Sequence, residues 1–444
     1  MERLSALSYA FLAAEDVDPG ASLVIGSVAV LDGPAPSVEE LRTHVRERLD
    51  LAPRYRERVH RTALDLTAPR WVPDPSFDID HHVTAAPVPG EGDDQDLAEV
   101  VGSVMSRRMD PHRALWDCHL VDGLDGGRWA LIARVHHALA DGLSGTALLR
   151  VLYDLDSDGD VHSGGGGVER APAAPAVPAS HTPVSRSPVA LASAVVRGSL
   201  ALAGALRPVR STFLTGPLGA GRSYAWSQVS LSAGRAAAHA HGVSLNDVVL
   251  ACVAGGFREL LLDAGLQPDR HALRTLVPVS SRAPGSEEHP DNRVTLLLPE
   301  LPVDVSDPFE RLAVVHARVA ALRREHEPEM GDLVQAVAGV LPFAVVAGAE
   351  RLGLGLPQRQ VATVATNVPG PREALSCLGR PVLDLLPYVP LADRVRVGVA
   401  VLSYRDVMSF GVTGDAASAI DIDGLARRIA GAWTTLCLGK PIAR

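Results

Sequence analysis

Apolar and polar positions follow two periods along the chain, and both periods occur in each half of the sequence. Short β-rich apolar runs close to glycine predict strands, and apolar positions three and four residues apart predict helices. The predicted strands are 22–31, 129–135, 294–298, 361–366, 395–402 and 407–412. The predicted helices are 38–49, 96–109, 245–264 and 308–324. Since both halves mix the two kinds of element, we expect an α/β fold with helices packed around sheets.

A segment rich in Gly, Pro, Ala and Ser interrupts this pattern at residues 156–188. Such a composition cannot bury a core, so the segment is predicted to be a flexible linker. It divides the chain into an N-terminal part, residues 1–155, and a C-terminal part, residues 189–444. If each part builds a sheet, the interface between them is the natural place for a ligand site.

The composition is that of a globular protein of enzyme size. The 444 residues are 47% hydrophobic and only 4% aromatic, and 42 Lys and Arg against 52 Asp and Glu give a net charge of −10. Without a block of basic residues, the sequence predicts no nucleic-acid partner and no charge-driven docking on an anionic membrane. Any membrane docking is therefore expected to be apolar and only weakly sensitive to salt.

Four widely spaced cysteines predict neither a zinc ribbon nor a disulfide framework, so we expect a cytoplasmic protein. The apolar start, residues 4–14, is followed directly by acidic residues and is predicted to fold rather than to act as a signal peptide. Charged residues interrupt the long apolar stretches 189–209 and 333–356, so neither is predicted to span a membrane.

The strongest chemical signal is the run RVHHALADGLSG at residues 134–145, where a predicted strand ends and an amphipathic helix begins. An imidazole there has an ordinary pKa of about 6.5 and can accept a proton at neutral pH. A lone histidine would more often be a buried polar group, but the pair His136-His137 followed by Asp-Gly favours catalysis. Asp141 itself has the character of a helix N-cap.

Other chemistries fit these residues less well. Adjacent histidines without an HExxH spacing do not form the usual zinc site, and residues 142–145 do not match the GxSxG of serine hydrolases. The phosphate-binding GxxxxGK[ST] motif is missing from the sequence as well. What remains is a histidine acting alone on a hydroxyl or an amine.

Residues 136–142, HHALADG, match the HHxxxDG motif of the CoA-dependent acyltransferase superfamily. Three further runs, LNDVVLA at 245–251, LVPVSSR at 276–282 and TNVPGP at 366–371, resemble the bacterial wax ester synthase/diacylglycerol acyltransferase family in order and spacing. The resemblance implies two chloramphenicol-acetyltransferase-like subdomains, each with a central mixed sheet flanked by helices, and a substrate tunnel at their interface. It also implies an acyl-CoA-dependent O-acyltransferase of lipid metabolism.

By this resemblance, His137 is the general base that deprotonates the attacking hydroxyl, and His136 supports it. Asp141 would orient the loop through an ion pair with Arg282, and Gly142 would form the turn. For Arg282 a solvated position after a strand is nearly as good an interpretation. No metal and no cofactor is implied, because acyl-CoA is itself a substrate.

Asn246 and Asp247 carry two interpretations. Ser244 and Asp247 resemble a capping box that starts a helix, while the resemblance places Asn246 in the channel, where it could polarise the thioester carbonyl. The residues implied to line the substrate tunnel are Leu115, Trp116, Asn367, Pro369 and Gly370. The family has proline where this chain has Ala114, which leaves the acyl-chain preference open. A second pair, His81-His82, lacks Asp-Gly and is predicted to be a structural or surface feature.

The expected acceptor is diacylglycerol, giving triacylglycerol, or a long-chain fatty alcohol, giving a wax ester. Such acceptors dissolve in membranes, so we expect peripheral docking at the inner membrane or at lipid droplets. Two alternatives remain at this point. One is transfer to a polyketide or peptide acceptor held by a carrier protein, and the other is a catalytically silent lipid-binding protein of the same fold.

Overall fold

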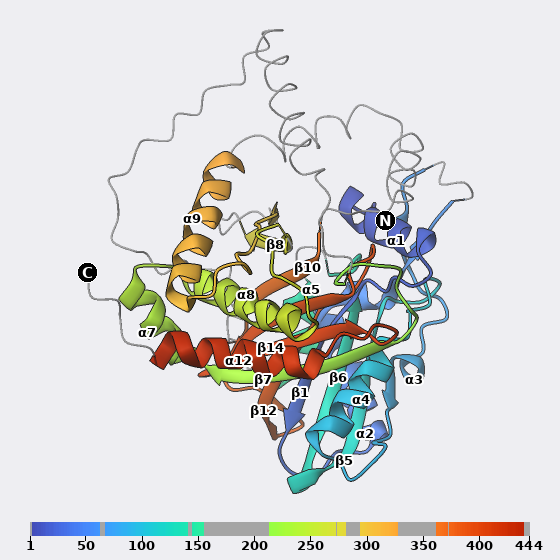
Figure 1. Ribbon diagram of the computed structural model, residues 1–444. Coiled ribbons are helices and arrows are strands. Elements are labelled where there is room, and N and C mark those ends of the chain that lie inside the picture. Colours follow the sequence, from blue (N-terminus) through green and yellow to red (C-terminus); the bar gives the residue numbers. More distant parts are fainter. Residues whose placement is uncertain are drawn as a thin grey trace, which may run out of the picture.

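Two six-stranded mixed sheets organise the chain in the computed structural model, which describes residues 2–62, 67–140, 144–154, 213–271, 273–280, 294–326, 361–371 and 373–438. The strands of the first sheet follow the order β11-β12-β1-β6-β5-β4 and those of the second the order β7-β14-β13-β10-β8-β9. Helices cover both sheets (Figure 1). The predicted α/β class, with mixed sheets flanked by helices, is confirmed.

The elements have the following bounds. The helices are α1 (Ala6–Val17), α2 (Val38–Arg48), α3 (Ile79–His82), α4 (Asp94–Met105), α5 (Ser144–Leu152), α7 (Leu231–His241), α8 (Leu245–Asp263), α9 (Pro308–His326) and α12 (Ile422–Leu438). The strands of the first half are β1 (Val24–Leu31), β2 (Glu57–His60), β3 (Arg70–Pro73), β4 (Val83–Ala85), β5 (Trp116–Leu124) and β6 (Arg128–His136). Those of the second half are β7 (Arg222–Ser230), β8 (Thr275–Ser280), β9 (Val294–Leu297), β10 (Thr363–Pro369), β11 (Ser376–Cys377), β12 (Arg380–Tyr388), β13 (Val397–Tyr404) and β14 (Val407–Asp415).

Each predicted strand and helix coincides with one of these elements, and the local sequence explains where several helices begin. Ser37 and Glu40 form a capping box at the start of α2, and Ser244 and Asp247 form the predicted one at the start of α8. Among the elements that were not predicted as such are the strands β5, β7 and β12 and the helices α1, α7 and α12. The apolar start of the chain does fold, as the helix α1.

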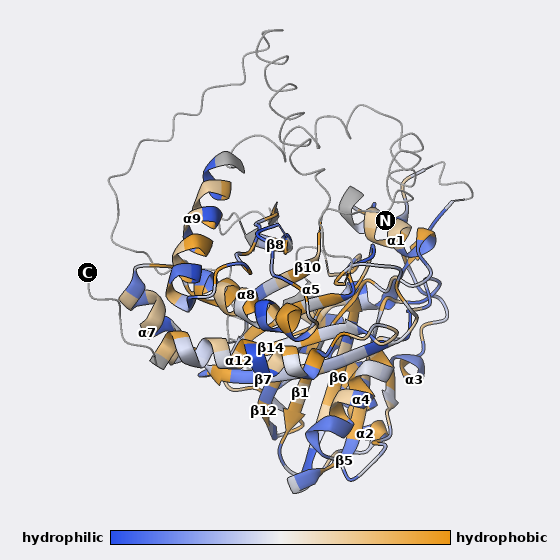
Figure 2. Cartoon of the chain, in the orientation of Figure 1, coloured by the Kyte–Doolittle hydropathy of each residue, from blue (hydrophilic) through white to orange (hydrophobic). Residues whose placement is uncertain are grey.

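The first sheet is buried on both faces. Alternate residues of its central strands β1 and β6 point to opposite sides, so that Leu31 packs with residues of α2 and α5 while Val30 packs with residues of α4. Figure 2 shows the resulting apolar colouring along β1 and β6. In the second sheet, α8, α9 and α12 pack on one face, and Gly256 of α8 lies close to Ile429 of α12.

The two sheets share chain segments. β12, from the C-terminal part, pairs antiparallel with β1, so that Val28 lies opposite Leu386. The same strand β12 also contacts the second sheet. The Tyr224 hydroxyl of β7 donates a hydrogen bond to the carbonyl oxygen of Pro387, 2.9 Å away. The division of the sequence into residues 1–155 and 189–444 therefore differs from the division into sheets. The predicted linker, residues 156–188, lies outside the described residues.

Candidate active site

The histidine pair stands at the end of β6, a central strand of the first sheet. The backbone N–H of His136 donates to the carbonyl oxygen of Leu115 at 3.0 Å, and that of His137 donates to Leu23 at 2.9 Å. The carbonyl of His136 then accepts from the N–H groups of Leu139 and Ala140, which closes a tight turn. Neighbouring strand ends thus hold the backbone of both histidines in place.

His136 is part of the internal hydrogen-bond network. Its side chain is buried, and its Nδ1 accepts a hydrogen bond from the backbone N–H of Ala138 at 3.0 Å. The proton of the neutral ring must therefore sit on Nε2, which lies 3.2 Å from Oε1 of Glu15. One nitrogen of the His136 ring thus accepts from the backbone, and the other faces a carboxylate.

Glu15 is a buried carboxylate that joins α1 to the site. It accepts a hydrogen bond from the backbone N–H of Leu23 at 2.5 Å, and Arg108 approaches its other oxygen at 3.3 Å. Burial alone would raise the pKa of Glu15, but His136, the Leu23 N–H and Arg108 together outweigh it and hold the pKa below its usual value. Glu15 is therefore an anion in the folded protein.

The side chain of His137 is half-buried, and its ring lies against an aromatic ring of α1, the helix that carries Glu15. The centroids of the Phe11 and His137 rings are 4.5 Å apart, with 30° between the planes. Phe11 and Glu15 are four residues apart, so they share one face of α1 and reach the two neighbouring histidines. Sequence reasoning missed both contacts. The one available signal was the acidic pair Glu15-Asp16 directly after the apolar run at the start of the chain.

Beneath the pair, a buried ion pair ties β6 to β5. Arg134 donates to both carboxylate oxygens of Asp117, at 2.7 and 2.5 Å, and also to the backbone carbonyl of Val104 at 2.6 Å. Burial alone would raise the pKa of Asp117, but His119 and Arg134 overcome this and lower it to about 2. This network makes a rigid base for the strand end that carries the histidines.

The start of α8 supplies a second group of polar side chains. Asp247 is buried and accepts from the backbone N–H of Ser244 at 3.0 Å and from Nδ1 of His316 at 2.9 Å. Asn246, which is half-buried, accepts a hydrogen bond from Nδ2 of Asn367 at 3.3 Å. Asn246 and Asn367 were predicted from separate motifs, and the structure brings them together. Asp247 has the predicted capping role, while His316 was not predicted.

The end of β10 lies against β13. A Cβ atom on Gly370 would stand 2.0 Å from the carbonyl oxygen of Ser403, so only glycine fits there. The backbone N–H of Gly370 also donates to the Ser403 hydroxyl at 3.3 Å. Pro369 is exposed. The place of Pro369 and Gly370 in a substrate tunnel stays a prediction.

Leu115 and Trp116, also predicted for the tunnel, are both core side chains with 1% exposure. The indole N–H of Trp116 donates to the carbonyl of Tyr55 at 2.8 Å, and its ring stacks on His82 with 4.8 Å between centroids. Burial lowers the pKa of His82, whose Nδ1 lies 2.7 Å from the backbone oxygen of Trp116. In the described structure, His82 thus serves the fold, as predicted.

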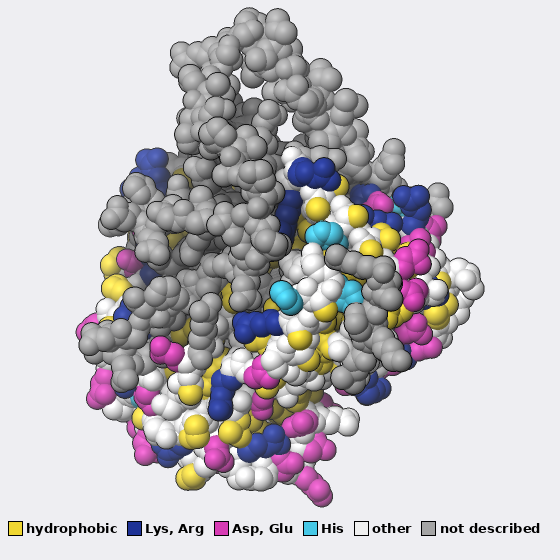
Figure 3. Space-filling view, turned by 90° about the vertical axis from the view of Figure 1, so that its left-hand side faces the viewer, with side chains coloured by type: hydrophobic (Ala, Val, Ile, Leu, Met, Phe, Trp, Pro, Cys, Tyr) yellow, Lys and Arg dark blue, Asp and Glu magenta, His cyan; other side chains and the backbone are white. Residues whose placement is uncertain are grey.

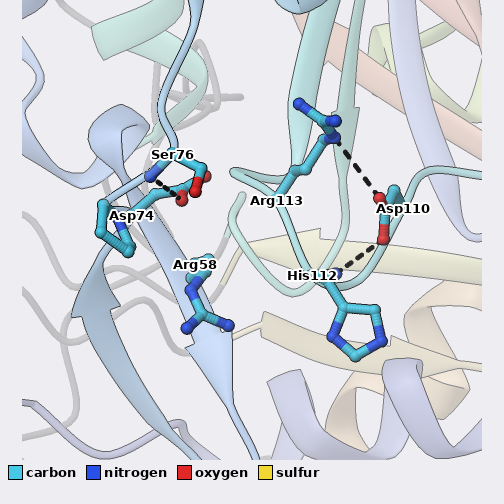
Figure 4. Close-up of a pocket in the computed structure, with 7 residues that line it drawn as sticks. Arg58, Asp74, Ser76, Asp110, His112 and Arg113 are labelled. Carbon is cyan, nitrogen blue, oxygen red and sulfur yellow. Dashed lines mark hydrogen bonds and ion pairs between the residues drawn. The ribbon is translucent and has the colours of Figure 1, made fainter.

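Several sequence-derived expectations lie outside the described residues: Asp141, Gly142, Arg282, and the apolar stretches 189–209 and 333–356. Two surface pockets are lined by other residues than His137: one of about 290 Å³ beside β2 (Figure 4) and one of about 640 Å³ beside α2. Within the described ranges, no cluster of His, Cys, Asp or Glu could hold a metal ion. No helix in those ranges is long and apolar enough to cross a membrane.

Family models match most of the chain. Residues 4–249 match the wax ester synthase/diacylglycerol acyltransferase catalytic domain, and residues 291–436 match the C-terminal domain of the same family. A probable diacylglycerol O-acyltransferase of Mycobacterium tuberculosis is 38% identical over 438 residues, covering 97% of this chain and 94% of that protein.

Two solved structures share the fold. The wax ester synthase/diacylglycerol acyltransferase from Marinobacter aquaeolei VT8 has a TM-score of 0.69 at 23% identity and covers 99% of both chains. The first condensation domain of the CDA synthetase has a TM-score of 0.58 at 15% identity, covering 100% of this chain and 97% of that one. With its motifs, its fold and a relative of this similarity, the chain belongs to the wax ester synthase/diacylglycerol acyltransferase family, and it is an acyltransferase.

Proposed function

We propose that the protein transfers an acyl group from acyl-CoA to a hydroxyl group, with diacylglycerol as acceptor to give triacylglycerol, or a long-chain fatty alcohol to give a wax ester. The observation that carries the proposal is the division of labour in the histidine pair. Nδ1 of the buried His136 accepts from the Ala138 N–H and its Nε2 faces Glu15, so we assign proton transfer to the half-buried His137. The diacylglycerol O-acyltransferase relative supports this choice of acceptor.

In this mechanism His137 takes the proton of the acceptor hydroxyl as that oxygen attacks the thioester carbonyl. The resulting tetrahedral intermediate collapses by breaking the carbon–sulfur bond, and the protonated His137 returns its proton to the departing CoA thiolate. The ester and free CoA are the products. No covalent acyl-enzyme forms, because a thioester is already an activated electrophile.

Asn246 is suited to stabilise the oxyanion of that intermediate. Its carbonyl oxygen is taken up by Asn367, so its amide N–H groups are the end that remains for a ligand. A donor of this kind favours the transition state over the ground state when it is aimed at the developing charge. The acceptors dissolve in lipid, so the reaction takes place where the protein meets the inner membrane or a lipid droplet from the cytoplasmic side.

The test compares wild type, His137→Ala and the control His81→Ala, with palmitoyl-CoA as donor and a panel of diacylglycerol and fatty alcohols as acceptors. His81 is a suitable control because it belongs to the other histidine pair and its side chain is 50% exposed. We expect His137→Ala to lose a factor of about 10² to 10⁴ in kcat, typical for loss of a general base. Undiminished ester formation by His137→Ala would exclude the mechanism. CoA release that is independent of acceptor would indicate a thioesterase instead.

A further inference from the structure

Three short segments next to α1 form a small antiparallel ribbon. β2 pairs with β3, so that His60 lies opposite Arg70, and residue 3 bridges to Arg70 from the other side. One face of the ribbon is buried through Val59 and Trp71. Because strand side chains alternate, Arg3, Arg58, His60 and Arg70 lie together on the opposite face, and we refer to these four residues as the basic ribbon face.

The basic ribbon face is cationic and lacks internal partners. Arg3, His60 and Arg70 are exposed and Arg58 is half-buried. In the described part of the chain their side chains make no ion pair or hydrogen bond, whereas neighbouring arginines are paired. Those pairs are Arg54 with Glu2 and Glu57, Arg56 with Asp50, and Arg61 with Asp16.

Carboxylates close to this face are already engaged. Figure 4 shows Arg58 reaching into a pocket of about 290 Å³, where Asp74 accepts from the backbone N–H of Ser76 at 3.0 Å. On the far side, Asp110 accepts from the N–H of His112 at 2.9 Å and pairs with Arg113 at 3.4 Å. Asp110 is thus paired with Arg113, and in the described part of the chain neither carboxylate forms an ion pair with Arg58.

Repulsion among the unpaired cationic side chains of the basic ribbon face destabilises the folded protein when no external anion is bound. Like charges directly opposite one another on neighbouring strands are destabilising, and Arg3 stands opposite Arg70. The chain has ten more acidic than basic residues, so carboxylates are abundant, and yet none of those described forms an ion pair with this face. On the face seen in Figure 3, by contrast, basic and acidic side chains of the described residues are interspersed. A row of unpaired arginines suits an external anion that several guanidinium groups can bind at once.

We propose that the basic ribbon face docks the protein on the phosphate groups of an anionic lipid bilayer. The face is presented outward by a short ribbon, which suits an extended planar surface. It is tied to α1 by the ion pair of Arg61 with Asp16 at 2.7 Å, and α1 carries Phe11, which lies against His137. Docking here places the helix that contacts the histidine pair next to the bilayer. The expectation of apolar docking that depends only weakly on salt, drawn from the net charge, then gives way to an electrostatic contact.

Vesicle sedimentation of the full-length protein tests the proposal. One set of vesicles is neutral phosphatidylcholine, and in the other about a third of the lipid is phosphatidylglycerol. The test variant is Arg3→Gln/Arg58→Gln/Arg70→Gln. The control variant, Arg46→Gln/Arg235→Gln/Arg427→Gln, removes the same charge from exposed positions on α2, α7 and α12. Thermal melting of both variants checks that the fold is kept.

We expect the wild type and the control to bind anionic vesicles, with affinity falling as salt is raised. The test variant should bind roughly a hundredfold more weakly, because each basic residue near an anionic membrane surface contributes about fivefold. Equal binding by the test and control variants would overturn the proposal, as would binding to neutral vesicles as tight as to anionic ones. A raised KM for palmitoyl-CoA without vesicles would assign the face to the donor's phosphates, and selective binding of a single-stranded oligonucleotide would assign it to nucleic acid. Vesicle binding needs no turnover, so its outcome is independent of the role of His137.

Discussion

At the scale of single residues, His136 and His137 differ in what their rings contact. His136 is held by the Ala138 N–H and by Glu15, while His137 lies against Phe11. The pair itself could be predicted from the sequence because the motif that contains it, HHALADG, is one continuous run at residues 136–142. Glu15 and Phe11 could not, since they lie more than a hundred residues away and reach the pair only through the packing of α1 on the first sheet.

Glu15→Gln tests the link between α1 and the pair. The amide keeps the size of the side chain but removes the charge that faces His136 and Arg108. We expect the free energy of unfolding at pH 7 to fall by about 1.5–3 kcal/mol, the usual range for hydrogen bonds to a charged group. We also expect kcat to fall while the KM for acyl-CoA is kept, because the His136 ring loses its anchor. An unchanged kcat would mean that Glu15 serves stability alone.

The pH dependence of that variant has a defined sign. The pKa of Glu15 in the folded protein lies below its ordinary value of 4.5, because His136, the Leu23 N–H and Arg108 outweigh the effect of burial. Its stabilising effect is therefore complete above about pH 4.5 and is lost as the pH falls through the lower, folded-state pKa. The difference in unfolding free energy between wild type and Glu15→Gln should shrink in acid. Urea titrations at several pH values measure it, and a constant difference would point to packing rather than charge.

At the scale of elements, local signals decided what could be predicted. The capping residues Ser244 and Asp247 predict the start of α8, and runs rich in β-branched and aliphatic residues predict β1 and β6. β7 mixes serine and glutamine with its aromatic residues, and β12 contains two prolines, so neither has a clear periodic pattern. Their places also depend on partners from the other half of the chain. Asp141 and Arg282, whose pairing follows only from the resemblance, remain predictions.

Close approach of backbones fixes the contact between β14 and β12. A Cβ atom on Gly411 would lie 1.9 Å from the carbonyl oxygen of Pro387. We expect Gly411→Ala to lower the free energy of unfolding by about 1–3 kcal/mol, as overpacking does. Gly431→Ala is the matched control, because nothing lies within 4 Å of its Cβ position in α12. There alanine should add up to about 1 kcal/mol through its better helix propensity. Chemical denaturation of both variants measures the contrast, and equal effects would contradict the close contact.

At the scale of the whole molecule, the average composition conceals two local arrangements. The net charge of −10 gave no sign of the basic ribbon face, because its arginines come from three separate segments. The linker-like composition of 156–188 likewise suggested a division of the chain into two parts. In the structure, residues 382–388 of the C-terminal part pair with β1 of the N-terminal part. The first sheet is thus completed by a strand that is distant in sequence.

Cutting the chain within residues 156–188 tests this dependence. Alone, the N-terminal fragment would keep the pairing of β1 with β6 but leave the other edge of this apolar strand open, so we expect the fragment to be unfolded or aggregated. Co-expression with the C-terminal fragment should return both in one soluble complex with acyl-transfer activity, measured by pull-down on one tagged fragment. Leu386→Asp should abolish the association because this side chain is 1% exposed, while Leu383→Asp, at 37% exposure, should be tolerated. A cooperatively folding N-terminal fragment would show instead that β12 is an accessory strand. The catalytic pair would then be assembled by the first half of the chain alone.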